Sequence, residues 1–116
     1  MSSLQLFNQA RKGRVSKMQV LMIRSKIKPE GVADVQAAVD KMLVALEAAQ
    51  PEGLRYAALI RPDDETIVAL RQLDDAAVNP LEDLPEYKHI LEIIEPLRAA
   101  PPVVEMWTVN GSYRMF

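Results

Sequence analysis

The chain has 116 residues, enough for one domain that buries roughly two-thirds of the surface exposed by its unfolded chain. Hydrophobic residues make up 49% and charged residues 26%, a composition that is typical of globular proteins and excludes a disordered polymer. The net charge of −2 argues against nucleic acid as the main partner, and the absence of cysteine excludes disulfides, thiolate metal sites and a cysteine nucleophile.

Residues 1–17 are predicted to be a basic N-terminal extension. This segment has four basic residues and no acidic residue, so it carries +4 and the rest of the chain carries −6. The sequence leaves open a disordered arm, a nucleic-acid-binding or transit segment, translation from Met18, and a short docked helix. No apolar run approaches the roughly 20 residues that cross a bilayer. With no signal peptide either, we expect a cytoplasmic protein that has no membrane partner.

Residues 18–116 are predicted to form a single domain that begins with a strand over 18–28. A helix is predicted over 31–50, because its apolar residues recur mostly at intervals of three or four and so form one stripe. Pro51 and Gly53 are expected to end this helix.

A hairpin is predicted next, with strands over 54–61 and 66–73 and a type I turn at 61–64, where proline suits the second position. A loop with one helical turn is expected to follow. Pro85 then begins a second helix, which Pro96 kinks or ends. The last predicted strand covers 103–109.

The order βαββαβ predicts a ferredoxin-like α+β fold, a four-stranded antiparallel sheet with two helices on one face. Both strands of the hairpin carry apolar residues on both faces, whereas a sheet with one wet face shows clean alternation. We therefore expect a homodimer in which two sheets pack face to face as a dimeric α+β barrel. The alternative is a mildly apolar solvent-exposed face. The apolar C-terminal residues Tyr113, Met115 and Phe116 favour docking on a partner.

Four short segments carry a resemblance to a known family. They are PEGLRY (51–56), the acidic turn DD (63–64), the strand ending LDD (73–75) and YKH (87–89). Over about residues 18–109 the chain resembles the antibiotic biosynthesis monooxygenase group of the dimeric α+β barrel superfamily. The resemblance implies a homodimer with a pocket between helices and sheet, where cofactor-free members oxidise polycyclic phenols with molecular oxygen.

The chain departs from the residue pattern of that group at three places. Related members degrade haem with an asparagine, a tryptophan and a histidine. Here the first strand has no asparagine, Leu73 stands at the tryptophan position, and residues 76–80 contain no histidine. The resemblance thus implies the fold more directly than the chemistry.

His89, the only histidine, is the weak candidate for a catalytic acid or base, because its ordinary pKa lies near neutrality. It lies about 200° around its helix from Tyr87, which favours an exposed surface position. One histidine without cysteine also makes a transition-metal site unexpected.

Four further residues are ligand-binding candidates. Tyr56 points to the apolar interior and is either core or a ligand contact. Trp107 could stack on a flat ligand or belong to the core or interface. Arg71 and Arg24 each have two interpretations: an interface ion pair, for Arg71 with Glu105 or a partner carboxylate, or a clamp for a substrate carboxylate.

The leading hypothesis is a small homodimer that binds a compact apolar or aromatic organic molecule, with cofactor-free monooxygenation as its activity. The alternative is a non-catalytic ligand-binding or interaction protein of the same fold. No cofactor is expected. Phosphate-binding loops, HExxH and GxSxG are absent from the sequence, which excludes several common enzyme classes.

Overall fold

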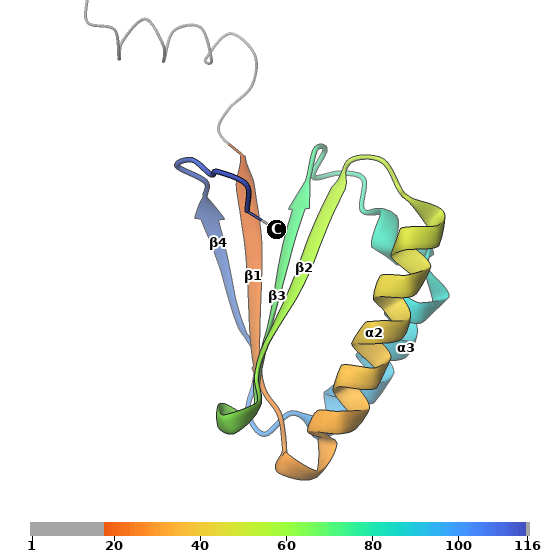
Figure 1. The fold of residues 1–116 in the computed structure, drawn as a ribbon, viewed down its shortest axis with the longest axis vertical. Helices are drawn as coiled ribbons and strands as arrows, with labels where there is room; N and C mark the ends of the chain where they lie inside the picture. The colour runs from red at the N-terminus through yellow and green to blue at the C-terminus, as the bar shows by residue number, and fades with distance from the viewer. Residues whose placement is uncertain (1–17, 116) are drawn as a thin grey trace, which may run out of the picture.

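The structure of the protein, a computed structural model, describes residues 18–115. The predicted extension over 1–17 and Phe116 lie outside the described residues. The described elements are, in chain order, β1 (Gln19–Lys26), η1 (Pro29–Gly31), α2 (Val32–Ala49), β2 (Leu54–Arg61), η2 (Pro62–Asp64), β3 (Thr66–Leu73), η3 (Pro80–Asp83), α3 (Pro85–Leu97) and β4 (Val103–Thr108). Figure 1 labels the strands and the two longer helices.

The four strands form one antiparallel sheet in the order β2-β3-β1-β4. Helices α2 and α3 lie side by side against one face of it (Figure 1). The predicted ferredoxin-like α+β fold is therefore confirmed. The central strands β1 and β3 are distant in sequence, so a crossover through α2 and the β2–β3 hairpin is needed to pair them.

Both hairpin strands have their predicted bounds, while other boundaries differ by a few residues. Strand β1 ends at Lys26 rather than residue 28, because the chain must turn into Pro29, which begins the short helix η1. The predicted type I turn at 61–64 is instead one 3₁₀ turn, followed by Glu65 in the left-handed region at φ 50°. Helix α3 includes Pro96 and ends one residue later.

The C-terminal end of α3 is held against the start of α2. Gly31 is buried, and a Cβ at this position would lie 2.8 Å from the side chain of Leu97. The amide of Lys28 donates a hydrogen bond to the carbonyl of Leu97 at 2.8 Å. An isolated β-bridge then joins Ile27 to Arg98. These contacts fix Arg98 at the end of β1.

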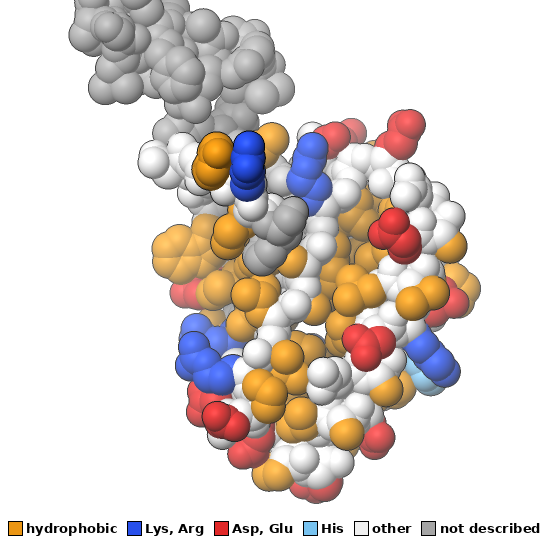
Figure 2. Space-filling model, in the orientation of Figure 1, with side chains coloured by type: hydrophobic (Ala, Val, Ile, Leu, Met, Phe, Trp, Pro, Cys, Tyr) orange, Lys and Arg blue, Asp and Glu red, His pale blue; other side chains and the backbone are white. Residues whose placement is uncertain are grey.

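The hydrophobic core lies between the helices and the sheet, where orange side chains gather in Figure 2. Its centre is Met42, which is completely buried. The stripe predicted from the spacing of apolar residues in the first helix supplies Val35, Val39 and Met42. Leu81 of η3 is also buried, and the side chain of Asn79 caps this turn by accepting a hydrogen bond from the Leu81 amide at 3.1 Å.

The two faces of the sheet follow from the strand register, because residues paired across antiparallel strands point to the same side. Tyr56 pairs with Arg71, and Ser25 pairs with Ile67, all on the side of the helices. The other side, here called the back face, is not covered by any helix of residues 18–115 (Figure 1). Its apolar residues are Val20, Met22, Ala57, Leu59, Val68, Leu70, Val103 and Trp107.

Candidate functional site

A cavity of about 70 Å³ lies between α3 and the helix side of the sheet. Most of its wall is apolar. Small side chains on the sheet leave the space open, since Ala58 and Ala69 are paired neighbours on β2 and β3 and both line it. Leu91 also lines it and is 41% exposed, so the cavity reaches the surface beside α3. The other apolar lining residues include Ile23, Val39, Ile67, Ile90 and Ile94.

Five side chains with polar atoms line the same cavity: Ser25, Tyr56, Arg71, Tyr87 and Arg98. Apolar pockets with a few convergent polar groups are the usual form of small-molecule sites. No aspartate or glutamate of the described residues lines it. The site therefore offers hydroxyl groups and positive charge, without any negative charge to balance them.

The hydroxyl of Tyr56 is kept protonated by its surroundings. The pKa of Tyr56 is raised to about 12, chiefly by burial and in addition by the neighbouring Tyr87, while Arg71 opposes the shift. A phenol with this pKa cannot act as a base at neutral pH. Tyr56 can instead donate a hydrogen bond into the cavity.

The two arginines have buried donor atoms that no group in the described part of the chain satisfies. The Nε atoms of Arg71 and Arg98 are both buried and have no hydrogen-bond partner among the described residues. Neither arginine is among the ion pairs of the described residues, which join Lys26, Arg55 and Arg61 to aspartates. A buried donor that lacks a partner costs about 1–3 kcal/mol. Each Nε is thus available to an acceptor brought by a ligand.

The arginines approach the cavity from opposite ends. Arg71 pairs with Leu21 near the start of β1, whereas Arg98 bridges to Ile27 beyond its end. Six residues of extended chain separate these positions, a distance of roughly 20 Å. Tyr56 pairs with Arg71 and therefore lies at the Arg71 end of the cavity. Ser25, which is 2% exposed, lies closer to the Arg98 end.

The structure brings two of the four ligand-binding candidates together, Tyr56 and Arg71. Trp107 and Arg24 lie instead on the back face, where Trp107 pairs with Val20 and is 55% exposed. Arg24 lines a separate surface groove on that side, beside Leu59. Neither residue lines the cavity, so neither can contact a molecule enclosed there.

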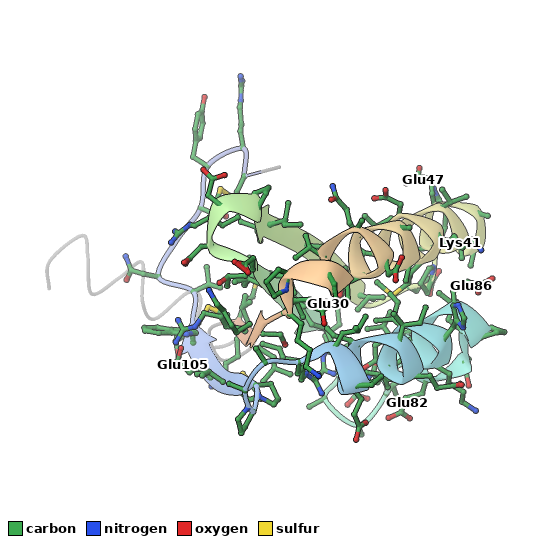
Figure 3. The ribbon with its side chains drawn as sticks, turned by 90° about the horizontal axis from the view of Figure 1, so that it is seen from below. Glu30, Lys41, Glu47, Glu82, Glu86 and Glu105 are labelled. Atoms are coloured by element: carbon green, nitrogen blue, oxygen red, sulfur yellow. The ribbon has the colours of Figure 1, made fainter. Side chains whose placement is uncertain are left out.

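The proposed pairing of Arg71 with Glu105 is wrong. Arg71 points to the helix side, whereas Glu105 pairs with Met22 and points to the back face. Figure 3 shows Glu105 on β4, away from the two helices. The sheet separates the two side chains. Arg71 does not lie on the back face, so it would not take part in an ion pair if two sheets packed through that face.

His89 is exposed on α3, on the surface that its helical angle predicts. It lines a shallow depression between α2 and α3, together with Asp34 and Lys41. It does not line the cavity. The residues described, 18–115, contain no group of three or more histidine, aspartate or glutamate side chains that could hold a metal ion.

Sequence reasoning missed two residues of the site, Tyr87 and Arg98. Tyr87 is partly buried against the core, and helical spacing alone gives no sign that it also lines the cavity. Arg98 follows the end of α3, and only the bridge to Ile27 turns it inward. The weak signal in the sequence was a single arginine between Leu97 and two alanines.

Within residues 18–115, no helix is both long and apolar enough to cross a membrane. No family model matches the chain, and no curated protein is similar to it in sequence.

Comparison with solved structures identifies the fold. A putative antibiotic biosynthesis monooxygenase from Nitrosomonas europaea matches with a TM-score of 0.66 at 13% identity, over 83% of this chain and 93% of that one. A second putative antibiotic biosynthesis monooxygenase, from Caulobacter crescentus, matches with a TM-score of 0.64 at 15% identity, over 89% of this chain and 99% of that one. SnoaB, a cofactor-independent oxygenase from Streptomyces nogalater, matches with a TM-score of 0.54 at 14% identity, over 86% of this chain and 100% of that one. The chain therefore has the fold of the antibiotic biosynthesis monooxygenases.

Proposed function

We propose that the protein binds a compact, largely apolar organic molecule in the cavity between α3 and the sheet. The observation that carries this proposal is an apolar cavity that reaches the surface and has a few polar groups at its ends. Its volume of about 70 Å³ favours a small ligand. For comparison, an engineered apolar cavity of about 150 Å³ binds benzene. A larger ring would have to extend through the opening beside Leu91.

Filling the cavity is expected to abolish this binding. Ala58→Leu adds three carbon atoms to the wall, and we expect it to weaken the binding of benzyl alcohol and isobutanol at least tenfold in NMR titrations. Ala48→Leu, on the exposed side of α2, is the matched control and should bind as the unmodified protein does. Circular dichroism checks that both variants fold. If the unmodified protein binds neither alcohol, or if Ala58→Leu binds them equally well, the proposal is wrong.

Cofactor-free monooxygenation is a second candidate, supported by the fold shared with SnoaB and with the putative monooxygenases. In such a reaction a phenol and one O₂ give a quinone and one water, and the phenol itself is the reductant. Two features favour binding without catalysis: no histidine of the described residues lines the cavity, and Tyr56 stays protonated at neutral pH.

An oxygen electrode separates the two candidates. If the protein is a monooxygenase, 1-naphthol should cause O₂ consumption in proportion to protein concentration, and Ala58→Leu should remove it while Ala48→Leu should not. Consumption equal to that of a protein-free sample contradicts the enzymatic candidate and leaves the binding function in place.

The protein is further proposed to form a homodimer through the back face. Eight apolar residues occupy this face, and among them Leu59, Val103 and Trp107 are at least 40% exposed. Tyr113 and Met115, which follow β4, are also highly exposed in the single chain. Extended apolar patches on a protein surface usually mark an interface, and a second copy would cover both sheets at once.

A further inference from the structure

We infer that the ligand of this cavity is an organic acid, and that its carboxylate binds at the end formed by Arg71 and Tyr56. The inference rests on the proposed binding function and adds the chemical class of the ligand and its orientation. A carboxylate accepts hydrogen bonds only, and both groups at this end donate them. The apolar part of the molecule would lie along Ala58 and Ala69 toward the middle of the cavity.

The Arg71 end of the cavity carries a positive charge that no acidic lining residue of the described chain balances. Arginine keeps its proton under all ordinary conditions, so Arg71 brings a full positive charge to the cavity wall. No acidic side chain of the described residues lines the cavity, and the buried Nε of Arg71 has no partner among them. An apolar neutral ligand would leave this donor unsatisfied. A carboxylate would satisfy it with a charge-assisted hydrogen bond.

Tyr56 is positioned to bind a carboxylate together with Arg71. Their Cα positions are register partners on β2 and β3, so the Cβ atoms lie about 4.5–5.5 Å apart on the same face. The Tyr56 hydroxyl stays protonated and can donate beside the guanidinium. No tyrosine is paired with Arg98, whose isolated bridge partner is the apolar Ile27, and the hydroxyl toward that end belongs to Ser25. This difference places the carboxylate at the Arg71 end.

The test compares acids with their uncharged amides of nearly equal shape. Isobutyrate and isobutyramide form one pair, and benzoate and benzamide form a larger one. In NMR titrations at pH 7 we expect each acid to bind at least tenfold more tightly than its amide. Arg71→Met should reduce this preference to less than threefold, the exposed Arg61→Met should retain it, and Arg98→Met should lower it less than Arg71→Met does.

The outcomes separate this inference from the proposed function. If amides bind as tightly as acids, the organic-acid inference is wrong and the binding function stands. If Arg98→Met rather than Arg71→Met removes the preference, the orientation is wrong. If neither acids, amides nor alcohols bind, the proposed function itself fails. Arg71→Met keeps an unbranched, though shorter, side chain and removes an unsatisfied donor, so it should fold, which thermal unfolding verifies.

Discussion

Leu70→Glu is expected to convert the proposed homodimer to a folded monomer. Leu70 lies at the centre of the back face, on strand β3, where it pairs with Met22 on one side and Ala57 on the other. A glutamate there would be exposed to water in a single chain but would bury two carboxylates between two copies. An unpaired charge in such an interface costs several kcal/mol, enough to prevent association. Sedimentation velocity at micromolar concentration measures the change.

Val44→Glu is the matched control for this variant. Val44 lies on the outer side of α2 and is 70% exposed, so an acid at this position should leave the assembly unchanged. Circular dichroism should show both variants folded. A well-folded monomer in the unmodified protein would contradict the proposed homodimer, as would a Leu70→Glu variant that remains dimeric.

The fold was predictable because each element has a strong local signal and the elements agree with one another. The bounds of β2 and β3 follow from proline, glycine and aspartate at their ends, and α2 follows from the spacing of Val35, Val39 and Met42. Errors were confined to places where the chain turns. At Glu65, for example, a left-handed residue closes the hairpin, and its sequence gives no signal for that conformation.

The site was harder to predict because it depends on which side chains meet across the sheet. The alternation in β2 correctly places Tyr56 on the interior side. The direction of Arg71 becomes clear only with the register, which pairs it with Tyr56 and separates it from Glu105. Arg98 could not be predicted, because a bridge formed after the end of α3 brings it to the cavity.

The positions of Arg71 and Arg98 favour ligand binding but lower the stability of the empty protein. A cavity with two unsatisfied arginine donors is less stable than one filled by apolar side chains. Such a cost is common where a protein binds a ligand, because the ligand supplies the missing partners when it arrives. Binding of an acid should therefore raise the melting temperature of the protein as the ligand concentration exceeds its dissociation constant.

Tyr56 is expected to make the protein lose stability between pH 10 and 12. Its pKa is about 12 in the folded protein, against 10.0 as the ordinary value that the unfolded chain has. In this range the unfolded state has lost the phenolic proton and the folded state retains it, so the free energy of unfolding falls as pH rises. The stability that protonated Tyr56 contributes is fully present below pH 10 and is lost by pH 12. A pKa difference of two units corresponds to about 2–3 kcal/mol in the free energy of unfolding.

Urea unfolding of Tyr56→Phe isolates this contribution from the titration of lysines and other tyrosines. Phenylalanine keeps the ring and has no proton to lose, so the stability of the variant relative to the unmodified protein should improve by about 2–3 kcal/mol between pH 9 and 12. Tyr113→Phe is the control, because Tyr113 is 81% exposed and its variant should follow the unmodified protein. Parallel pH profiles for Tyr56→Phe and the unmodified protein would mean that the Tyr56 hydroxyl is not buried. Tyr56 could then not act as a buried hydrogen-bond donor to a ligand in the cavity.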